Sequence, residues 1–600
     1  MNARRRSAAP AVAAASTPPL VAGWRRPPTP AVASLLVFVL AVVAFANTFG
    51  HGFVWDDSVL LDQKVRFYTG WLDAWREPPG LPNMRMDRPL ELMTLWIDRR
   101  LWRASTGFHV TQVLLHAVNG VLVLRLARAL GMATWAALAA AALFVVHPVQ
   151  VESVAWLTCR ADVLTGTFAM LAMLAFLRGQ AASTWWAAPA VAAASFLATA
   201  AKETGSVTPA LLVAALAVIP RPEAPAVARL RRAWPALVAS LVGVLLCQAL
   251  RPPEVTTGIG RSALDGQDLL NLAGAFGYQI ARVVAPVDFA PYVPTTPTDP
   301  GHVALAALGA LGLGVLALRP CRDGVRRLGA LWFVIAVAPA VAVVLADFSV
   351  TPVAERRLYL GMTGVALLVA SALHERRALA ASGPAITVIA LVLATLLATT
   401  VARNRHWRDD LTLWSAVAAA APDDALPSMN LGLALAAAGR ASEAEAAYRR
   451  ALALRPRDVT RQRTCINLGL LLVERGALDE AEALFARANA IAEHAIAERG
   501  LAMIARRRGQ AARRAGDVAT AERELSRALD AAERALAINP RYPQGHATLA
   551  GALYDAGRYR EALAHYQRAA ALAGDDAVGR DAAESARQLG DWLAAHPAAR

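Results

Sequence analysis

Long apolar runs separated by short charged stretches fill the first two thirds of the chain. Each run is rich in Ala, Leu and Val, and most approach the ~20 residues that a helix needs to cross a bilayer. The sequence therefore predicts an all-α, polytopic membrane helix bundle of about eleven spans. The predicted spans cover residues 31–50, 110–124, 133–146, 163–177, 185–200, 206–219, 234–250, 303–318, 328–345, 358–373 and 385–401.

The charges between these runs predict one orientation in the membrane. Alternate loops carry basic clusters, as the positive-inside rule requires, at Arg125, Arg128, Arg178, Arg229, Arg231, Arg232, Arg319, Arg322, Arg326, Arg327, Arg376 and Arg377. We interpret a further stretch, 269–284, as an interfacial or re-entrant helix, because counting it as a span would move the 319–327 cluster outside. The N-terminus then lies in the cytoplasm and the C-terminal region on the outer side.

After residue 403 the sequence becomes charged, Ala-rich and helical, typical of a soluble domain. One unit matches the tetratricopeptide pattern at Leu431, Gly432, Leu435, Ala444, Tyr448, Ala451 and Pro456. Similar units follow near Leu468 and Leu549, and 516–540 is typical of a degenerate repeat with a long second helix. Stacked helix pairs form a concave surface that holds an extended peptide. We assign acceptor binding there to Asn430, Tyr448 and Asn467; a self-associating scaffold is the alternative.

These patterns divide the chain into four parts. Residues 1–30 are rich in Arg, Pro, Ala and Ser without periodicity, which predicts a disordered cytoplasmic tail. A transmembrane domain is predicted over 31–402, a connector over 403–424 and a tetratricopeptide-repeat (TPR) domain, an α-solenoid, over 425–600. High Ala and Arg content suggests GC-rich coding in a bacterium, which places the bundle in the inner membrane and the repeats in the periplasm.

Composition narrows the class of protein further. The chain is 56% hydrophobic and 18% charged, with a mean hydropathy of +0.38, as expected for a membrane protein. Its formal net charge of +15 does not indicate a nucleic-acid partner, because many arginines lie beside apolar runs and no basic stripe is interleaved with aromatic residues. The four cysteines form no C-x-x-C pair, so neither a zinc site nor a disulfide framework is predicted.

The acidic pair Asp56 and Asp57 follows the first span directly. A carboxylate in hydrocarbon costs about 2.5–3.5 kcal/mol, so acids at the mouth of a span serve solvent contact or chemistry; a polar stop to the helix is the simpler alternative. The predicted outer side carries further candidate site residues, at Arg88, His147, Glu152, Arg160, Asp162, Lys202, Glu203, Glu355, Arg356 and Tyr359.

These residue types suit transfer from a phosphate leaving group at a membrane surface. Such a reaction needs a carboxylate to accept a proton, cations to stabilise the phosphate charge, and an apolar groove for a lipid tail. A proton-coupled transporter also uses acids and cations but places them near mid-membrane, so transport is the weaker hypothesis.

Several short motifs occur in a distinctive order along the chain: WDD, RPL, FHVTQVLLHAVN, HPVQVESVAW, CRADVL, AKETG, ERRLYL and NRHWRDDLTLW. In this order they resemble the transmembrane and tetratricopeptide-repeat O-mannosyltransferases and their bacterial relatives. The resemblance covers most of residues 53–570. It implies a GT-C class, inverting glycosyltransferase that moves a mannose-like sugar from dolichyl or polyprenyl phosphate to Ser or Thr of a protein.

The resemblance also implies roles for individual residues. It assigns the general base, or its partner, to Asp56 and Asp57, and we assign Arg88, Lys202 and Arg356 to the donor phosphate. Glu203 and Glu355 could instead orient those cations through ion pairs. This sequence departs from the family pattern at Cys159, where relatives generally have Gly, and at Arg357 within ERRLYL.

The sequence leaves alternatives open for the cofactor and for the class of activity. The acidic pair could ligate a divalent ion, but no fixed metal-ligand spacing is present, so the lipid-linked sugar is the only small-molecule requirement that we predict. A non-catalytic membrane anchor whose repeats assemble an envelope complex is the main alternative. A lipid-linked substrate flippase is the third hypothesis.

Overall fold

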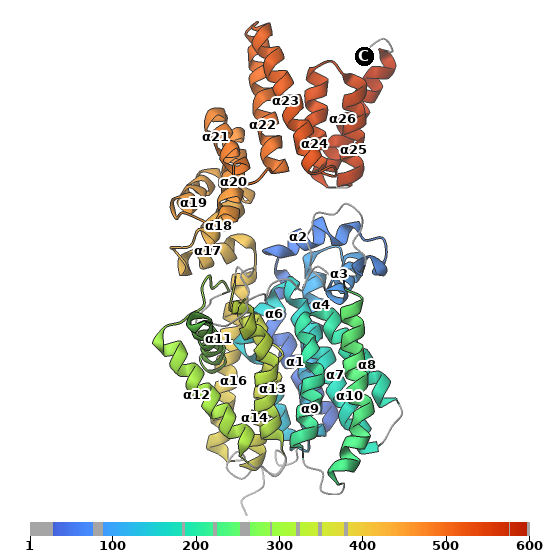
Figure 1. The fold of residues 1–600 in the computed structure, drawn as a ribbon, viewed down its shortest axis with the longest axis vertical. Coiled ribbons are helices and arrows are strands. Elements are labelled where there is room, and N and C mark those ends of the chain that lie inside the picture. The colour runs from blue at the N-terminus through green and yellow to red at the C-terminus, as the bar shows by residue number, and fades with distance from the viewer. Residues whose placement is uncertain are drawn as a thin grey trace, which may run out of the picture.

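The structure is a computed structural model that describes residues 28–75, 88–182, 186–219, 225–251, 265–287, 291–319, 324–345, 351–376, 382–574 and 576–596. These residues form helices and connecting turns, and no strand occurs among them. Residues 1–27 of the predicted tail lie outside this part of the chain. Figure 1 shows an upright helix bundle with a stack of further helices above it.

The bundle contains one helix at each predicted span, which confirms the all-α, polytopic class. These helices are α1 (Pro30–Phe45), α4 (Ser105–Ala129), α5 (Thr134–Val146), α7 (Arg160–Ala182), α8 (Ala187–Ala201), α9 (Thr208–Val218), α10 (Ala226–Ala249), α12 (Pro300–Leu318), α13 (Val325–Ala342), α14 (Gly361–Glu375) and α16 (Gly383–Asn404).

The span count of eleven is not confirmed by length and composition. Seven segments in the described residues are long and apolar enough to cross a membrane, or eight if α5 and the bent segment Pro148–Ala155 form one span. Helices α8, α9 and α14 have 15, 11 and 15 residues. They are shorter than the ~20 residues of a typical span, and they pack against longer helices of the bundle.

The predicted interfacial stretch is helix α11 (Gly266–Val284), which lies near the repeat end of the bundle (Figure 1). It is not among the segments apolar enough to cross. Gly277 lets α11 approach the start of α12, because a Cβ at this position would lie 1.8 Å from the carbonyl oxygen of His302.

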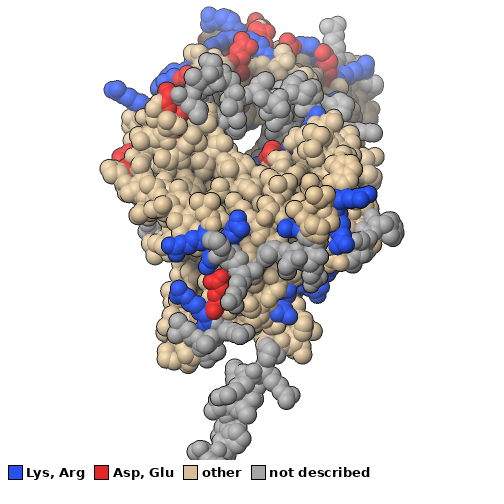
Figure 2. All heavy atoms as spheres, turned by 60° about the horizontal axis from the view of Figure 1, so that its bottom comes forward, with Lys and Arg blue, Asp and Glu red and all other residues tan. Residues whose placement is uncertain are grey.

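Charged and apolar residues divide the surface of the bundle as a membrane requires. Figure 2 shows basic residues at the end remote from the repeats and a largely uncharged belt above them. Leu35, Leu245, Leu311 and Leu391, on four different helices of this belt, are 56–66% exposed. Side chains of this kind suit contact with lipid tails. The chain is therefore a multi-pass membrane protein.

The C-terminal helices form four antiparallel pairs and a last single helix. After α17 (Asp410–Ala420), the pairs are α18 (Ala425–Ala437) with α19 (Ala441–Ala453), α20 (Asp458–Arg475) with α21 (Leu478–Asn489), α22 (Ala495–Arg514) with α23 (Val518–Ile538), and α24 (Pro543–Asp555) with α25 (Tyr559–Ala573); α26 (Ala577–Ala595) follows. The region predicted as a degenerate repeat contains the long helix α23, which has 21 residues.

The segment that joins α1 to α4 lies between the bundle and the repeats (Figure 1). It contains α2 (Asp56–Gln63) and α3 (Pro89–Leu101), with short 3-10 turns at Val65–Phe67 and Trp71–Ala74. Arg66 of this loop contacts the last repeat, where its guanidinium lies 3.2 Å from the Asp576 carboxylate. At the other end of the solenoid, Tyr292 donates a 3.2 Å hydrogen bond to Asp424. The repeats are thus tied to the membrane domain at both of their ends.

Candidate functional site

The turn in front of the acidic pair has an unusual backbone conformation. Trp55 has φ 54° and ψ −115°, in a region that costs a residue with a side chain about 1–3 kcal/mol. Its N–H donates a 2.7 Å hydrogen bond to Asp410 in α17. Its ring stacks on Trp156, with the centroids 4.7 Å apart, and meets Trp414 edge-on at 4.9 Å. Contacts from the membrane domain and from the connector helix α17 therefore hold this turn.

Asp57 is fixed within the protein. The residue is 1% exposed. Its carboxylate accepts hydrogen bonds from Val54 N (3.1 Å), Thr158 N (2.9 Å) and Thr158 Oγ1 (2.7 Å). Burial raises the pKa of Asp57 to about 7, although these three donors favour the charged form. Because both of its carboxylate oxygens are occupied, Asp57 supports the turn and is not free for a substrate.

Asp56 is half-buried and has a different environment. Among the residues that the structure describes, no donor or cation lies within hydrogen-bonding or ion-pair distance of its carboxylate. Burial raises the pKa of Asp56, and the charges of Arg356 and Arg463 act in the opposite direction. Arg463 belongs to α20 of the repeats. Asp56 therefore has free oxygens and lies within the electrostatic reach of both domains.

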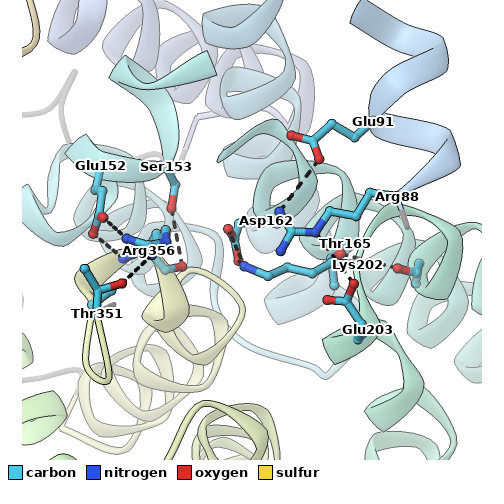
Figure 3. Close-up of polar contacts among 12 residues, drawn as sticks. Arg88, Glu91, Glu152, Ser153, Asp162, Thr165, Lys202, Glu203, Thr351 and Arg356 are labelled. Atoms are coloured by element: carbon cyan, nitrogen blue, oxygen red, sulfur yellow. Dashed lines mark hydrogen bonds and ion pairs between the residues drawn. The ribbon is translucent and has the colours of Figure 1, made fainter. Parts of the chain in front are cut away.

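Arg356 belongs to the 3-10 turn Glu355–Leu358, which precedes α14. Its guanidinium pairs with Glu152 of the short helix α6 (Val151–Ala155), and its N–H donates to the same carboxylate at 2.8 Å. It also donates to Thr351 Oγ1 at 3.0 Å and lies 5.3 Å from the centre of the Trp156 ring. Figure 3 shows this cluster on one side of the site. The same tryptophan thus contacts both Arg356 and the turn before Asp56.

A second cluster lies opposite the first (Figure 3). Lys202 follows α8 and donates to both oxygens of Asp162 at 2.7 Å, and both side chains are under 10% exposed. Arg88, at the start of α3, lies 3.7 Å from Glu203 and 3.8 Å from Glu91. Burial alone would raise the pKa of Glu203, but Arg88 and Lys202 hold it below its usual value. The three cations assigned to the donor phosphate therefore occur in two facing clusters, each paired with acids.

Glu91 is a member of this second cluster that the sequence did not single out. The residue is fully buried, and burial raises its pKa to about 7. Within the described ranges, neither of its carboxylate oxygens has a hydrogen-bond donor, and Arg88 is the cation next to it. Its position directly after the RPL motif, in the first turn of α3, was the signal available in the sequence.

Four of the predicted site residues are engaged inside the protein instead. Arg160 is fully buried and bonds to Asp98 (2.6 Å), Gln112 (3.0 Å) and the Phe108 carbonyl, so it is a structural cation and not a phosphate ligand in this geometry. Tyr359 Oη accepts a hydrogen bond from Asn119 at 2.9 Å and contacts His116 at 2.8 Å. His147 Nε2 contacts the Val283 carbonyl at 3.1 Å. Glu355 pairs with Arg403, and with Arg282 at 3.6 Å.

Tyr448, predicted to bind the acceptor, lies inside the first helix pair of the repeats. The residue is 1% exposed and its ring fills the space above Gly432, where a Cβ would lie 2.7 Å from the ring. It therefore joins helices α18 and α19. Asn430 and Asn467, on the first helices of their pairs, are half-buried. A cavity of about 440 Å³ lies further along the solenoid, between α22, α24 and α26, and its charged lining residues are Arg499, Arg506, Arg507 and Asp581.

No group of three or more His, Cys, Asp and Glu side chains placed to hold a metal ion occurs in the ranges described above. The acidic pair offers free oxygens only at Asp56, since Asp57 is bonded to Val54 and Thr158. The candidate site therefore consists of one free carboxylate, two clusters of cations and the nearby end of the repeats.

Parts of the chain match a known family model and known proteins. The tetratricopeptide repeat family model matches residues 429–456. The chain is similar to protein O-mannosyl-transferases, which confirms the resemblance predicted from its motifs.

Three of these relatives define the extent of the similarity. Protein O-mannosyl-transferase Tmtc2 of Drosophila melanogaster is 37% identical over 23% of this chain and 16% of its own length. TMTC4 of Homo sapiens is 31% identical over 26% of this chain and 25% of its own length. F38B6.6 of Caenorhabditis elegans is 25% identical over 70% of this chain and 62% of its own length. The matched part of the chain thus spans less than two thirds of each relative.

Proposed function

We propose that the protein is an inverting membrane glycosyltransferase. It moves a mannose-like sugar from a polyprenyl or dolichyl phosphate to a Ser or Thr hydroxyl of a protein that the repeats present. The observation that carries this proposal is the free carboxylate of Asp56. The charges of Arg356 on the membrane domain and of Arg463 on the repeats both act to lower its pKa. The names of the similar proteins support the same class of reaction.

Asp56 acts as the general base. It accepts the proton of the acceptor hydroxyl while the hydroxyl oxygen attacks the anomeric carbon of the sugar. The bond between that carbon and the phosphate oxygen breaks, and the electron pair leaves with the lipid phosphate. Asp57 holds the turn that aims Asp56, through its bonds to Val54 and Thr158.

The cations stabilise the leaving phosphate. Arg356 on one side, with Lys202 and Arg88 on the other, places positive charge around the space between the two clusters of Figure 3. Glu152, Asp162 and Glu203 pair with these cations and keep their side chains extended before the donor binds. Such preorganised charge lowers the barrier because no side chain has to reorient during the reaction.

The acceptor approaches from the side of the repeats. The α-solenoid adjoins the same end of the bundle as Asp56, and Arg463 of α20 influences the charge of that carboxylate. With the N-terminus in the cytoplasm, this end faces the periplasm of a bacterial inner membrane. Folded repeats of this kind hold extended polypeptides, which suits delivery of a Ser or Thr side chain.

Sugar transfer in isolated membranes tests the proposal. Membranes with the wild-type protein, a polyprenyl-phosphate mannose and a periplasmic protein extract should give mannosylated Ser or Thr, detected by mass spectrometry. Asp56→Asn should reduce the rate by about 10²–10⁴-fold, the usual contribution of a general base. Glu375→Gln, at the opposite end of the bundle, is the matched control and should leave the rate unchanged.

Two results would contradict the proposal. Equal rates of transfer by the wild type and by Asp56→Asn would show that Asp56 is not the general base. Absence of transfer by the wild type, together with loss of envelope complexes only when the repeats are deleted, would favour the non-catalytic scaffold. Addition of a chelator during the same assay tests whether a divalent ion assists.

A further inference from the structure

A cavity of about 550 Å³ lies at the end of the bundle remote from the repeats. It is formed where α1 begins, α4 ends, α5 begins and α7 ends. Three arginines line it, Arg125 and Arg128 from α4 and Arg178 from α7, and no acidic residue is among its lining residues. Positive charge from two helices therefore converges on one hollow.

These arginines have few partners in the protein. All three are exposed, and in the described part of the chain neither Arg125 nor Arg178 makes a hydrogen bond or an ion pair. Arg128 donates one guanidinium N–H to the Met132 carbonyl. By contrast, Arg326 at the same end of the bundle pairs with Glu375 at 3.1 Å. The cavity thus holds guanidinium groups that an anion can still neutralise.

Apolar residues also line the cavity. Leu124 and Leu174 line it together with the first turn of α1. From there an exposed apolar face of α1 leads into the membrane belt, with Val32, Leu35 and Leu36 47–62% exposed. A free inorganic anion would gain nothing from these surfaces, whereas a phospholipid would place its phosphate on the guanidiniums and its glycerol and acyl chains along the leucines.

We propose that this cavity binds the headgroup of an anionic phospholipid from the leaflet on the side away from the repeats. The site is separate from the proposed transfer chemistry, which lies at the other end of the bundle. Basic pockets between transmembrane helices recognise anionic headgroups through charge-assisted hydrogen bonds to the phosphate. The bound lipid places a phosphate anion among three converging cations and joins the ends of α1, α4 and α7.

Lipid binding to the purified full chain tests the site. Phosphatidylglycerol is added to the protein in detergent with phosphatidylcholine as competitor, and bound lipid is counted by native mass spectrometry. Arg125→Gln with Arg178→Gln should weaken retention of phosphatidylglycerol roughly 25-fold, about fivefold for each basic residue removed. Arg125→Lys with Arg178→Lys should retain most of the binding, because the charge is kept.

The matched control is Arg231→Gln with Arg232→Gln, which removes the same charge from exposed residues at the start of α10 outside the cavity. This pair should bind phosphatidylglycerol like the wild type. An equal loss in both glutamine pairs, or no loss in either, would overturn the site. Displacement of the lipid by inorganic phosphate would also overturn it, since the cavity would then be a free-anion site.

A single variant, Arg178→Gln, keeps the test valid if the double variant does not fold. It should lose about fivefold in retention while its melting temperature stays close to that of the wild type without added lipid. Unchanged retention in this variant would likewise overturn the site.

Discussion

The backbone N–H of Trp55 donates a 2.7 Å hydrogen bond to Asp410, which opens the helix α17 that leads into the repeats. The two residues are 355 positions apart in the sequence. Trp55 holds a backbone conformation that is unfavourable by itself, so its geometry depends on this bond and on the stacked Trp156 and Trp414 rings. The connector helix before the repeats thereby fixes the turn that aims Asp56.

Loss of this bond should slow transfer without weakening donor binding. Asp410→Ala leaves the Trp55 N–H unpaired, at a cost of about 1–3 kcal/mol, and a misplaced base lowers kcat by ~10–100-fold. Asp410→Asn keeps an oxygen acceptor and should retain most of the rate. Asp409→Ala removes the neighbouring N-cap of α17, which accepts from Thr412 N at 2.7 Å, and is the control. Steady-state kinetics should separate the two, and an equal loss of kcat in both alanine variants would mean that only the stability of α17 matters.

Asp57 should affect stability in a pH-dependent manner. Because its folded pKa is about 7 and its unfolded pKa is ~3.9, the folded state holds the proton more tightly and stability falls as pH rises between these values, by about 4 kcal/mol in total. Asp57→Asn does not titrate, and it turns an amide donor towards either Val54 N–H or the two Thr158 donors.

The variant should therefore be more strongly destabilised, relative to wild type, at pH 5 than at pH 8. Melting temperatures in detergent at the two pH values measure this difference. Thr158→Val, which removes one of the donors to Asp57, provides an independent check, since it should raise the folded pKa further and extend the fall to higher pH. A constant difference between wild type and Asp57→Asn across this range would show that Asp57 is ionised throughout.

The sequence predicted the positions of the helices well because local hydrophobicity decides them. Every predicted span has a helix, and α11 lies near the repeat end and is not among the segments apolar enough to cross. Helices α9 and α14 are short, and the surrounding bundle buries many of their residues. Their apolar content alone did not predict this burial.

The different environments of the two acids could not be predicted from the sequence. Asp56 and Asp57 are adjacent and chemically identical. The structure separates them through distant residues such as Thr158, 101 positions away, which donates to Asp57. Tyr448 illustrates the opposite case in the repeats. Its place in the repeat pattern reflects the packing of α18 on α19 through Gly432, so the pattern predicts how this helix pair packs.

Arg463 should set the acid side of the pH profile. Asp56 must be ionised to accept a proton, and the charge of Arg463 lowers its pKa. Arg463→Gln removes that charge, so the pKa of Asp56 rises and the rise of kcat/KM with pH should move to higher pH. At alkaline pH the variant should match the wild type. Arg514→Gln, another exposed arginine of the repeats, should leave the profile in place. A uniform loss of rate at every pH would instead indicate a role for Arg463 in acceptor binding.

Tyr448 should contribute to folding and not to acceptor recognition. Tyr448→Ala empties a buried site between α18 and α19 and should cost about 3–5 kcal/mol of stability. Tyr448→Phe keeps the ring against Gly432 and should change stability by less than about 1 kcal/mol, with an unchanged KM for the acceptor. Thermal unfolding and acceptor titrations measure both effects. A raised KM in a normally stable Tyr448→Phe protein would restore the binding role.

Arg66 should control how easily the far end of the repeats separates from the membrane domain. Its guanidinium donates to the carbonyls of Leu572 and Ala573 at 3.1 and 3.0 Å, at the C-terminal end of α25, and pairs with Asp576, which caps α26. A cation at this end also interacts favourably with the helix dipole.

Arg66→Ala should therefore lower the free energy of local opening by about 1–2 kcal/mol, and amide exchange in 559–596 should accelerate by roughly 5–30-fold. Arg99→Ala removes an exposed pair with Asp62 in the same loop, 3.7 Å apart, that does not involve the repeats, and should leave this exchange unchanged. Because the repeats are tied to the membrane domain at both ends, the release should also lower KM for a large folded acceptor more than for a short peptide. Equal KM changes for the two acceptors would mean that acceptors do not enter by this end.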